Sequence, residues 1–299
     1  MSEPVISVVI GTYNQADVLM RVLKALNEQT LSPQQYEVVV VDSMSDDGTE
    51  SLVSAHEPKH HFQYIREANK GKAYARNFGV RKANGKFVVI TDADMIADER
   101  FIETHLAAQE SSSEPTCFEG LTYNLDYLHW PPKSDAIAPY ISANYEPGKK
   151  LGWFYFLTGN LSFPKSLFIL ESGFSEAFDG YGWEDLELGY RLSKKKVPLF
   201  YLKAAVNYHY HVITKQEEIE RCYNKGISAK TFLSLHPELK WFLGLNPLSV
   251  SIFKRLAPEG AVHRLFRDRI FVSKKPALRG FGFWFLKEFQ YLRGILRTE

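Results

Sequence analysis

The stretch VISVVIGTYN (Val5–Asn14) is a short β-branched apolar run that ends in small and polar residues. A helical pattern follows, with Val18, Leu19, Val22, Leu23 and Leu26 on one face. Similar apolar runs recur at Tyr36–Val41, Phe62–Ile65 and Phe87–Thr91, separated by helix-like stretches at Glu50–Ala55 and Lys72–Ala83. Buried strands that alternate with amphipathic helices predict βαβ units and a mostly parallel sheet covered on both faces.

Polar residues follow three of these runs. In such sheets, ligands bind at the carboxyl ends of the strands, so Thr12-Tyr13-Asn14, Asp42 and the pair Asp92/Asp94 are the first candidates for a site. Mg²⁺ and Mn²⁺ take oxygen ligands and share them with substrate phosphates. Acidic residues after strands are also common as helix caps, so the pair alone leaves both interpretations open.

Other segments also allow a structural or a functional interpretation. Asn69–Asn77 combines Gly71 with lysine and arginine, which suits either a phosphate site or a plain helix start. Trp183-Glu184-Asp185 places two carboxylates at a helix start. There they can interact favourably with the helix dipole or supply a general base. Two short strands are predicted at Val197–Tyr201 and Ala204–His209, and His209-Tyr210-His211 stands at the end of the second.

The composition sets limits on the class of protein. Of the 299 residues, 45% are apolar, which rules out wholesale disorder. The two cysteines, Cys117 and Cys222, lie far apart and predict no disulfide framework, so a reducing cytoplasm is expected. We expect neither a signal peptide nor a membrane-spanning helix, and we expect a nucleic-acid partner to be absent.

The near-neutral net charge of +1 conceals an asymmetry. Residues 251–299 carry a net charge of +7, and the rest of the chain is acidic. Within this tail, Phe285, Phe289, Leu292 and Leu296 form an apolar stripe, with Trp284 beside it and Lys287, Arg293 and Arg297 at its flanks. The stripe is typical of a helix on an anionic membrane surface, at the cytoplasmic face, or of a helix that packs on the catalytic domain.

Six segments in register resemble family 2 glycosyltransferases. They are Ile6–Asn14, Val38–Thr49, Asn69–Val80, Thr91–Met95, Gly159–Phe168 and Gly173–Leu192. The last contains Gly182-Trp183-Glu184-Asp185, a version shared with galactosyl- and N-acetylgalactosaminyl-transferring members, including bacterial chondroitin polymerases. The resemblance covers about residues 5–211.

The resemblance implies a GT-A fold, an α/β architecture in which helices flank a Rossmann-like, mostly parallel sheet. Residues 1–212 would form this domain, with a nucleotide-sugar half at 1–110 and an acceptor half at 111–212. Residues 213–299 would form a basic, mainly helical extension. The activity implied is metal-dependent transfer of a hexose or N-acetylhexosamine from a UDP-sugar, with inversion, to a glycan or lipid-linked saccharide.

The resemblance also assigns residues to the donor. Tyr13 would lie against the nucleobase, Asp42 would hydrogen-bond it, and Asp92 would face the ribose or a metal-bound water. Asp94 would ligate Mn²⁺ or Mg²⁺ on the diphosphate together with His209, for which His211 is a competitor. The full set of expected donor-binding residues is Thr12, Tyr13, Asn14, Asp42, Lys72, Arg76, Asn77, Asp92 and Ala93.

On the acceptor side, Asp185 would be the catalytic base and Glu184 would hold sugar hydroxyls. The residues expected to bind the acceptor are Gly159, Asn160, Tyr181, Gly182 and Trp183. The family usually has tryptophan between two glycines. This chain has Tyr181 there, between Gly180 and Gly182, and Trp183 follows directly after Gly182. Which aromatic ring stacks on the acceptor is therefore open.

Four other classes were weighed against the transferase. An oxidoreductase would need GxGxxG where the chain has Gly-Thr-Tyr-Asn, and a nucleotidyltransferase would need a glycine-rich basic signature after the first strand. A metallohydrolase built on His209 and His211 would lack an HExxH spacing. The last alternative is an inactive GT-A-like module that binds nucleotide-sugar or glycan, which the presence of every expected carboxylate disfavours.

Overall fold

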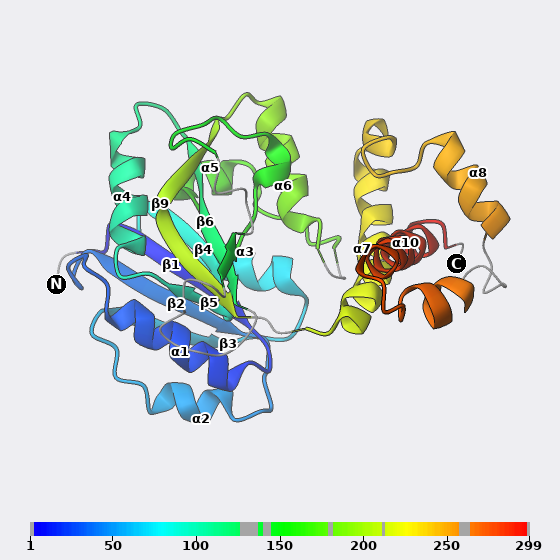
Figure 1. Cartoon of the computed structure of the whole chain (residues 1–299). Helices are drawn as coiled ribbons and strands as arrows, with labels where there is room; N and C mark the ends of the chain where they lie inside the picture. The colour runs from blue at the N-terminus through cyan, green and yellow to red at the C-terminus, as the bar shows by residue number, and fades with distance from the viewer. Residues whose placement is uncertain are drawn as a thin grey trace. The chain divides into compact units, whose positions relative to one another are not determined.

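The computed structural model of the chain describes residues 3–125, 137–139, 145–178, 182–210, 213–256 and 264–297. The chain divides into two compact units. The first comprises Met1–Glu176 and Asp185–Val212, and the second comprises Ala177–Glu184 and Ile213–Glu299. Figure 1 colours the chain from blue at the N-terminus to red at the C-terminus. Among the described residues, no helix is both long and apolar enough to cross a bilayer.

The first unit is built on one mixed sheet, in the order β3-β2-β1-β4-β8-β6-β9-β5 with β7 beside β6. Strands β1 to β4 pair in parallel, β8 runs antiparallel to β4 and to β6, and β6 and β9 are parallel. The strands are β1 (Ile6–Thr12), β2 (Tyr36–Asp42), β3 (His61–Arg66), β4 (Phe87–Asp92), β5 (Met95–Ala97), β6 (Cys117–Leu125), β7 (Ile137–Pro139), β8 (Leu161–Pro164) and β9 (Leu199–Tyr210).

Helices cover both faces of this sheet because alternate strand residues point to opposite sides. Val8, Val38 and Val89 pack in one core with α1 (Ala16–Asn27), α2 (Thr49–Ser54) and α4 (Phe101–Ser111), and α1 and α2 can be followed in Figure 1. Their neighbours Val9, Val39 and Val88 pack in a second core with α3 (Lys72–Lys82), α5 (Lys165–Leu170) and α6 (Glu184–Lys194). The α/β fold is confirmed.

One predicted detail of the sheet is wrong. The two strands expected at Val197–Tyr201 and Ala204–His209 form the single strand β9. Gly120 pairs with Leu202, but the next residue, Leu121, pairs with Val206, so three residues of β9 bulge out of the ladder. The break in the apolar pattern therefore marks a β-bulge, which leaves the strand continuous.

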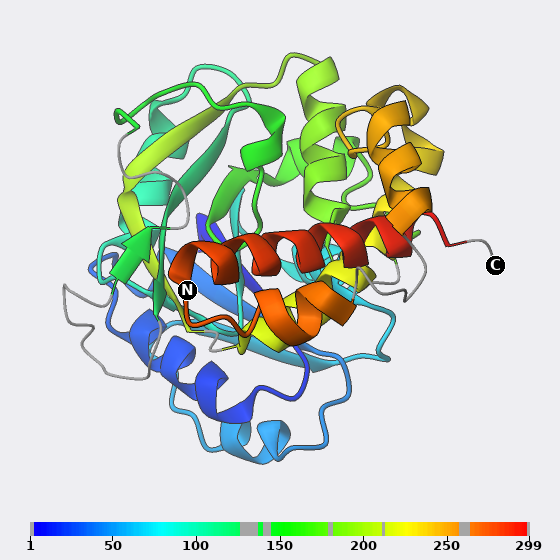
Figure 2. The same cartoon turned by 45° about the vertical axis from the view of Figure 1, so that its right-hand side comes forward.

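The second unit consists of helices in its described residues. They are α7 (Lys215–Leu235), η3 (Pro237–Lys240), α8 (Pro247–Leu256), η4 (Phe266–Ile270) and α10 (Pro276–Ile295). Thr214 and Glu217 form a capping box at the start of α7. Helices α7 and α10 lie side by side (Figure 2), and a Cβ atom on Gly226 would lie only 2.1 Å from the Tyr291 carbonyl oxygen. Glycine therefore permits the backbones to touch.

The apolar stripe of the tail lies on an inner face of this unit. Phe289 is buried, and Phe285 stacks on Phe266 with 3.7 Å between ring centroids. The central side chains of the stripe are therefore covered by other residues of the second unit, and contact of this segment with a membrane stays a prediction.

Candidate functional site

The polar ends of three strands meet at one edge of the sheet. Thr12 at the end of β1 pairs with Asp42 at the end of β2, and Gly11 pairs with Asp92 at the end of β4. Thr12 is buried, and its hydroxyl finds no hydrogen-bond partner among the described residues. Tyr13 is half exposed beside it. The structure thus brings these sequence-predicted residues together at the carboxyl ends of β1, β2 and β4.

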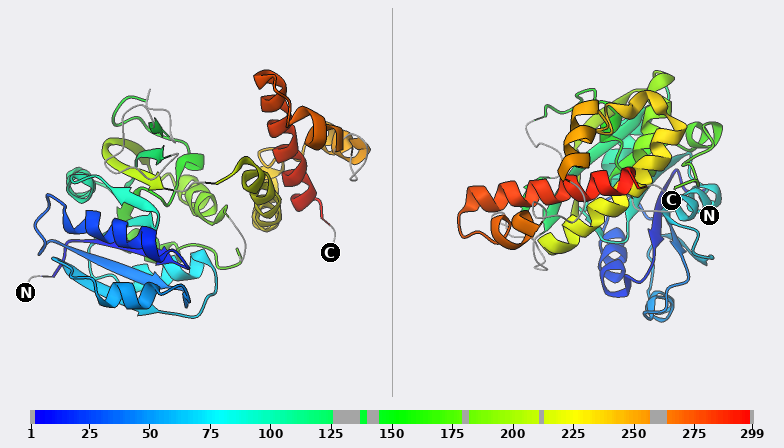
Figure 3. Two further views of the ribbon diagram at one scale, coloured as in Figure 1. Left: turned by 60° about the horizontal axis from the view of Figure 1, so that its bottom comes forward. Right: turned by 90° about the vertical axis from the view of Figure 1, so that its right-hand side faces the viewer.

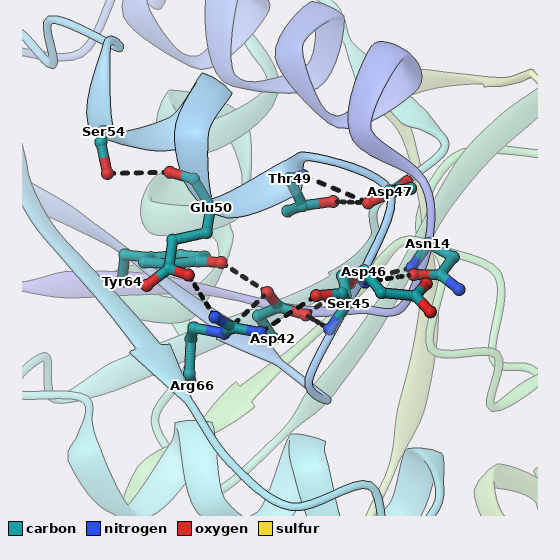
Figure 4. Close-up of polar contacts among 10 residues, drawn as sticks. All are labelled: Asn14, Asp42, Ser45, Asp46, Asp47, Thr49, Glu50, Ser54, Tyr64 and Arg66. Carbon is teal, nitrogen blue, oxygen red and sulfur yellow. Dashed lines mark hydrogen bonds and ion pairs between the residues drawn. The ribbon is translucent and has the colours of Figure 1, made fainter.

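Asp42 is buried and engaged by the protein itself (Figure 4). Its carboxylate accepts hydrogen bonds from the Ser45 amide at 2.9 Å, the Ser45 hydroxyl at 2.6 Å and the Tyr64 hydroxyl. The Arg66 guanidinium lies 3.8 Å away. Burial and the bond to Asp42 raise the pKa of Tyr64. The Asp42 side chain is therefore fully enclosed in this conformation, and its expected contact with a nucleobase stays a prediction.

The loops after β1 and β2 are joined by side-chain hydrogen bonds. The Asn14 amide donates to the Ser45 hydroxyl, and the Asn14 side chain accepts from the Asp46 amide at 3.0 Å. Asn14 holds φ at 52°, in the left-handed region that asparagine tolerates. Asp47 accepts from the Ala16 amide at the start of α1. Asn14 is thus exposed, and its hydrogen bonds also help to fix the loop that carries Tyr13.

An ion pair with Arg76 holds the carboxylate of Asp92 at the end of β4. The Arg76 guanidinium on α3 lies 2.6 Å from the Asp92 carboxylate, and only 3% of the Arg76 surface is exposed. Asp92 itself keeps about a quarter of its side chain exposed. The charge of Arg76 thus lies inside the protein and orients Asp92, and a direct contact of Arg76 with the donor stays a prediction.

Two further expected donor contacts are also buried. Asn77 donates to the Phe174 carbonyl oxygen and accepts from the Phe174 amide, at 2.9 Å each, so its amide ties α3 to a distant loop. Ala93 is fully buried in the core beside α1 and α4. Neither side chain faces a ligand, because each fills the protein interior. Lys72, at the first turn of α3, is exposed.

Asp94, just before β5, and His209, near the end of β9, lie close together. The His209 Nε2 atom is 3.5 Å from the Asp94 carboxylate, because β5 pairs Met95 with His209 and the Tyr210 amide donates to the Asp94 carbonyl oxygen at 2.8 Å. The Nδ1 atom of His209 lies 3.2 Å from the Asn124 side-chain oxygen. A hydrogen on Nδ1 that is donated to Asn124 leaves the lone pair on Nε2, which faces Asp94. His211 lies outside the described residues.

This pair suits a divalent cation that takes its remaining ligands from phosphate. Within the described parts of the chain, no three His, Cys, Asp or Glu side chains are grouped as a complete metal site. One carboxylate and one imidazole nitrogen can still bind Mn²⁺ or Mg²⁺ when substrate oxygens complete the shell, as is usual for Mg²⁺. Asn124, absent from the sequence-based site, supplies the outer contact that orients the histidine.

The acceptor-side residues Gly159 and Asn160 are mainly structural in this conformation. Asn160 is fully buried and donates to the carbonyl oxygens of Leu121 and Ala205, so it satisfies the bulge of β9. Its own side-chain oxygen lies 2.9 Å from the His105 ring. The polar atoms of the Asn160 side chain are engaged inside the sheet, and its contact with an acceptor stays a prediction. Gly159 keeps partial exposure and contacts Met95 closely.

The expected catalytic carboxylates lie at the start of α6. Glu184 is buried, and Asp185 is partly exposed and accepts a hydrogen bond from the Leu186 amide at 2.8 Å. Glu119 on β6, missed by the sequence-based predictions, is also buried. Burial raises its pKa well above the usual value, the Leu157 amide opposes this, and the charge of Asp185 adds to the rise. Burial of Glu119 therefore favours the protonated form of its carboxyl group, and the charge of Asp185 acts in the same direction.

Trp183 belongs to the second unit rather than to an open platform. Its indole NH donates to the Lys225 carbonyl oxygen at 2.9 Å, and its ring contacts Phe232, Phe242 and Tyr291. It holds φ at 78°, directly after Gly182 at 83°. Trp183 therefore packs against helices of its own unit, and which aromatic ring stacks on an acceptor stays open. Tyr181, the other candidate, lies outside the described residues.

Comparisons with known proteins agree with this geometry. The family model for glycosyl transferase family 2 matches residues 7–171, and a model for the N-terminal domain of galactosyltransferase matches residues 139–215. Validoxylamine A glucosyltransferase of Streptomyces hygroscopicus subsp. limoneus is 31% identical over 66% of this chain and 49% of its own length. Chondroitin synthase of Escherichia coli is 26% identical over 75% of this chain and 37% of its own length. The chain thus spans half or less of these two relatives.

Solved structures support the fold over nearly the whole chain. The mannosyltransferase PcManGT from Pyrobaculum calidifontis, in complex with GDP-Man and Mn²⁺, superimposes with a TM-score of 0.64 at 18% identity, covering 100% of this chain and 89% of its own. S. aureus TarS 1-349 in complex with UDP gives 0.57 at 16% identity, covering 97% and 90%. These likenesses confirm the GT-A fold. Because the family model covers more than half of the residues, with the acidic strand ends inside it, this chain belongs to glycosyltransferase family 2.

Proposed function

We propose that this chain transfers a hexose or N-acetylhexosamine from a UDP-sugar to a glycan or lipid-linked saccharide, with inversion at the anomeric carbon. The observation that carries the proposal is the Asp94–His209 pair beside the Arg76–Asp92 ion pair at the strand ends. A carboxylate and an imidazole that can share a cation with a diphosphate suit a nucleoside diphosphate leaving group. Structural neighbours solved in complex with GDP-Man, UDP and UDP-GlcNAc support a nucleotide-sugar as the class of donor.

On the donor side, the chain's own residues bind and orient. Tyr13 is exposed at the sheet edge and offers its ring to the base, while the unpartnered Thr12 hydroxyl offers a hydrogen bond. Asp92, fixed by Arg76, faces the ribose or a water. Asp94 and His209 would hold Mn²⁺ or Mg²⁺, which stabilises charge on the departing diphosphate when it is bound.

On the acceptor side, Asp185 takes the proton of the attacking hydroxyl. It is partly exposed at the start of α6. A carboxylate positioned beside the acceptor hydroxyl can accept its proton as a general base. A single base is enough for inversion, because the acceptor oxygen attacks from the face opposite the diphosphate. Glu184 is proposed to hold sugar hydroxyls.

The site is proposed to work in a reducing compartment, at the cytoplasmic side. Cys117 is buried, Cys222 is half-buried, and both are free thiols. Unpaired thiols that do not form a structural disulfide are typical of proteins kept in such a compartment.

A donor panel tests the proposal. The chain is incubated with Mn²⁺ and each of several UDP-sugars and GDP-mannose, with and without saccharide acceptors, and release of the free nucleotide is followed by mass-resolved chromatography. Release of UDP from one or two UDP-sugars, increased by an acceptor, is expected. Release with GDP-mannose alone would overturn the donor assignment. Binding of UDP without release from any sugar nucleotide would instead support the inactive binding module.

A further inference from the structure

A second surface, far along the chain from the sheet edge, combines exposed apolar side chains with cations. It is formed by η4, by the first half of α10 and by the segment between them, which lie together in the second unit (Figure 3). We call it the basic-aromatic surface, and its residues are Arg264, Leu265, Arg269, Val272, Lys274, Lys275, Leu278, Arg279, Phe281 and Trp284. All ten side chains are exposed.

The apolar members are large and unusually open to solvent. Val272 is 64% exposed, Trp284 54% and Phe281 50%. Leu278, Phe281 and Trp284 follow each other at three-residue intervals on α10, so they share one face of the helix. The rings of Phe281 and Trp284 stack with 5.8 Å between their centroids. Side chains of this kind, contiguous and uncovered within their own unit, are typical of an interaction site.

Inner contacts hold this face in place. Phe266 on η4 contacts both Phe281 and Phe285 of α10. A Cβ atom on Gly282 would lie 2.7 Å from the Phe271 backbone nitrogen, so the chain after η4 touches α10 directly. Phe289 is buried by this packing, whereas Leu278, Phe281 and Trp284 on the earlier turns of α10 stay 45%, 50% and 54% exposed.

The charge around these apolar side chains is strongly positive. Residues 264–297 contain nine Lys and Arg but only two Asp and Glu. Three cations elsewhere in the stretch bond within the protein: Arg267 to Asp268, Lys287 to Glu218, and Arg297 to Tyr223. Lys274, Lys275 and Arg279, by contrast, form no ion pair with any residue the structure describes. They flank the exposed apolar row and are available to an anionic partner.

We propose that the basic-aromatic surface docks on an anionic lipid bilayer. Tryptophan and phenylalanine partition to the interface between headgroups and acyl chains, and cations beside them are attracted to anionic headgroups. Valine and leucine in the middle of the surface suit acyl chains, whereas phosphates of a nucleic acid would satisfy only the cations. The surface lies outside the sheet-edge residues, so it goes beyond sugar transfer and concerns where the chain acts.

Vesicle co-sedimentation of the full chain tests this proposal. Phosphatidylcholine vesicles with and without phosphatidylglycerol are compared at low and physiological salt. Binding to the anionic vesicles alone, weakened by salt, is expected. The variant Lys274→Gln/Lys275→Gln should weaken binding by about fivefold for each cation removed, since each cation near an anionic surface contributes of that order. Phe281→Ser/Trp284→Ser should remove most of the remaining, salt-resistant binding.

Matched controls separate the surface from general charge and hydrophobicity. Lys24→Gln/Lys59→Gln removes two exposed lysines of the first unit, and Trp241→Ser/Leu248→Ser removes two exposed apolar side chains of the second unit. Both should sediment like the unchanged chain, and melting curves show that all variants fold. Equal binding to neutral and anionic vesicles, or unchanged binding by both surface variants, would overturn the proposal. Self-association that Phe281→Ser/Trp284→Ser abolishes, with no vesicle binding, would assign the surface to a second copy instead.

Discussion

At the scale of single residues, the proposed base is the sharpest point to test. Asp185→Asn keeps the size of the side chain but cannot accept the acceptor proton, so transfer should fall by about 100-fold or more. The dissociation constant of UDP in the presence of Mn²⁺, measured by calorimetry, should stay within about twofold, because Asp185 lies on α6 whereas the proposed donor-side residues lie at the ends of β1, β2 and β4. Near-normal turnover by this variant would show that another group is the base.

The Asp94–His209 pair makes a separate prediction about donor binding. Asp94→Ala removes one of two protein ligands and should weaken Mn²⁺-dependent UDP binding, while UDP binding in the presence of a chelator changes little. Asn124→Leu removes the group that orients His209 and should cost about 10- to 100-fold in metal affinity. Asp17→Ala, an exposed carboxylate on α1, serves as the control. If the Asp94 and Asn124 variants titrate like this control, the cation binds elsewhere.

Glu119 makes a prediction about stability and pH. Its pKa is raised in the folded protein, so folding favours the protonated form. Its contribution is therefore greatest at pH values below the ordinary carboxyl pKa of about 4.3, and is lost as pH rises toward the raised value.

Glu119→Gln is neutral at every pH and should gain stability relative to the unchanged chain as pH rises. Urea unfolding at pH 5 and pH 8 measures this, with exposed Glu57→Gln as the control. A Glu119→Gln variant that loses stability with rising pH as the unchanged chain does would contradict the buried neutral carboxyl.

At the scale of elements, local patterns predicted the strands from β1 to β4 because β1, β2 and β4 are almost entirely apolar and are followed by polar residues, with β3 the weakest of the four patterns. The bulge in β9 was not predictable, because it depends on Asn160, just before β8, reaching the Ala205 carbonyl oxygen. The same holds for the candidate site: Asp94 and His209 followed from a motif, whereas Asn124 and Glu119 lie in a strand with no distinguishing pattern. The spacing in α10 showed that an apolar stripe exists but left two partners open, a membrane or the protein itself.

The crossing of α7 and α10 is an element-scale feature with a measurable cost. Gly294→Ala would place a Cβ atom 2.2 Å from the Tyr223 carbonyl oxygen, so the helices must move apart. Overpacking of this kind typically costs about 1–3 kcal/mol. Gly280→Ala in the same helix meets no atom within 4 Å. It should stabilise by about 0.5–1 kcal/mol through helix propensity. Thermal unfolding that shows equal effects for both would mean that the helices do not touch at Gly294.

At the scale of the whole molecule, the chain passes between the two compact units three times, at each end of Ala177–Glu184 and again between Val212 and Ile213. Trp183 packs with helices of the second unit, and Asp185, two residues later, belongs to the first. Because Trp183 and Asp185 are only two residues apart in the chain, the packing of Trp183 in the second unit limits the conformations open to the backbone just before Asp185, the proposed base. The second unit is therefore expected to support catalysis through stability, in addition to any surface it presents.

Trp183→Ala distinguishes this role from sugar stacking. Loss of the ring contacts and of the hydrogen bond to Lys225 should lower the free energy of unfolding by about 2–4 kcal/mol, because a large aromatic side chain is removed from a packed cluster. Trp241→Ala, whose ring is 73% exposed, should change it far less. Calorimetric melting is compared with the acceptor KM at a temperature where both variants are folded. If Trp183 stacks on the acceptor instead, its KM rises while the melting curve stays in place, whereas packing predicts a lower melting temperature and an acceptor KM close to that of the unchanged chain.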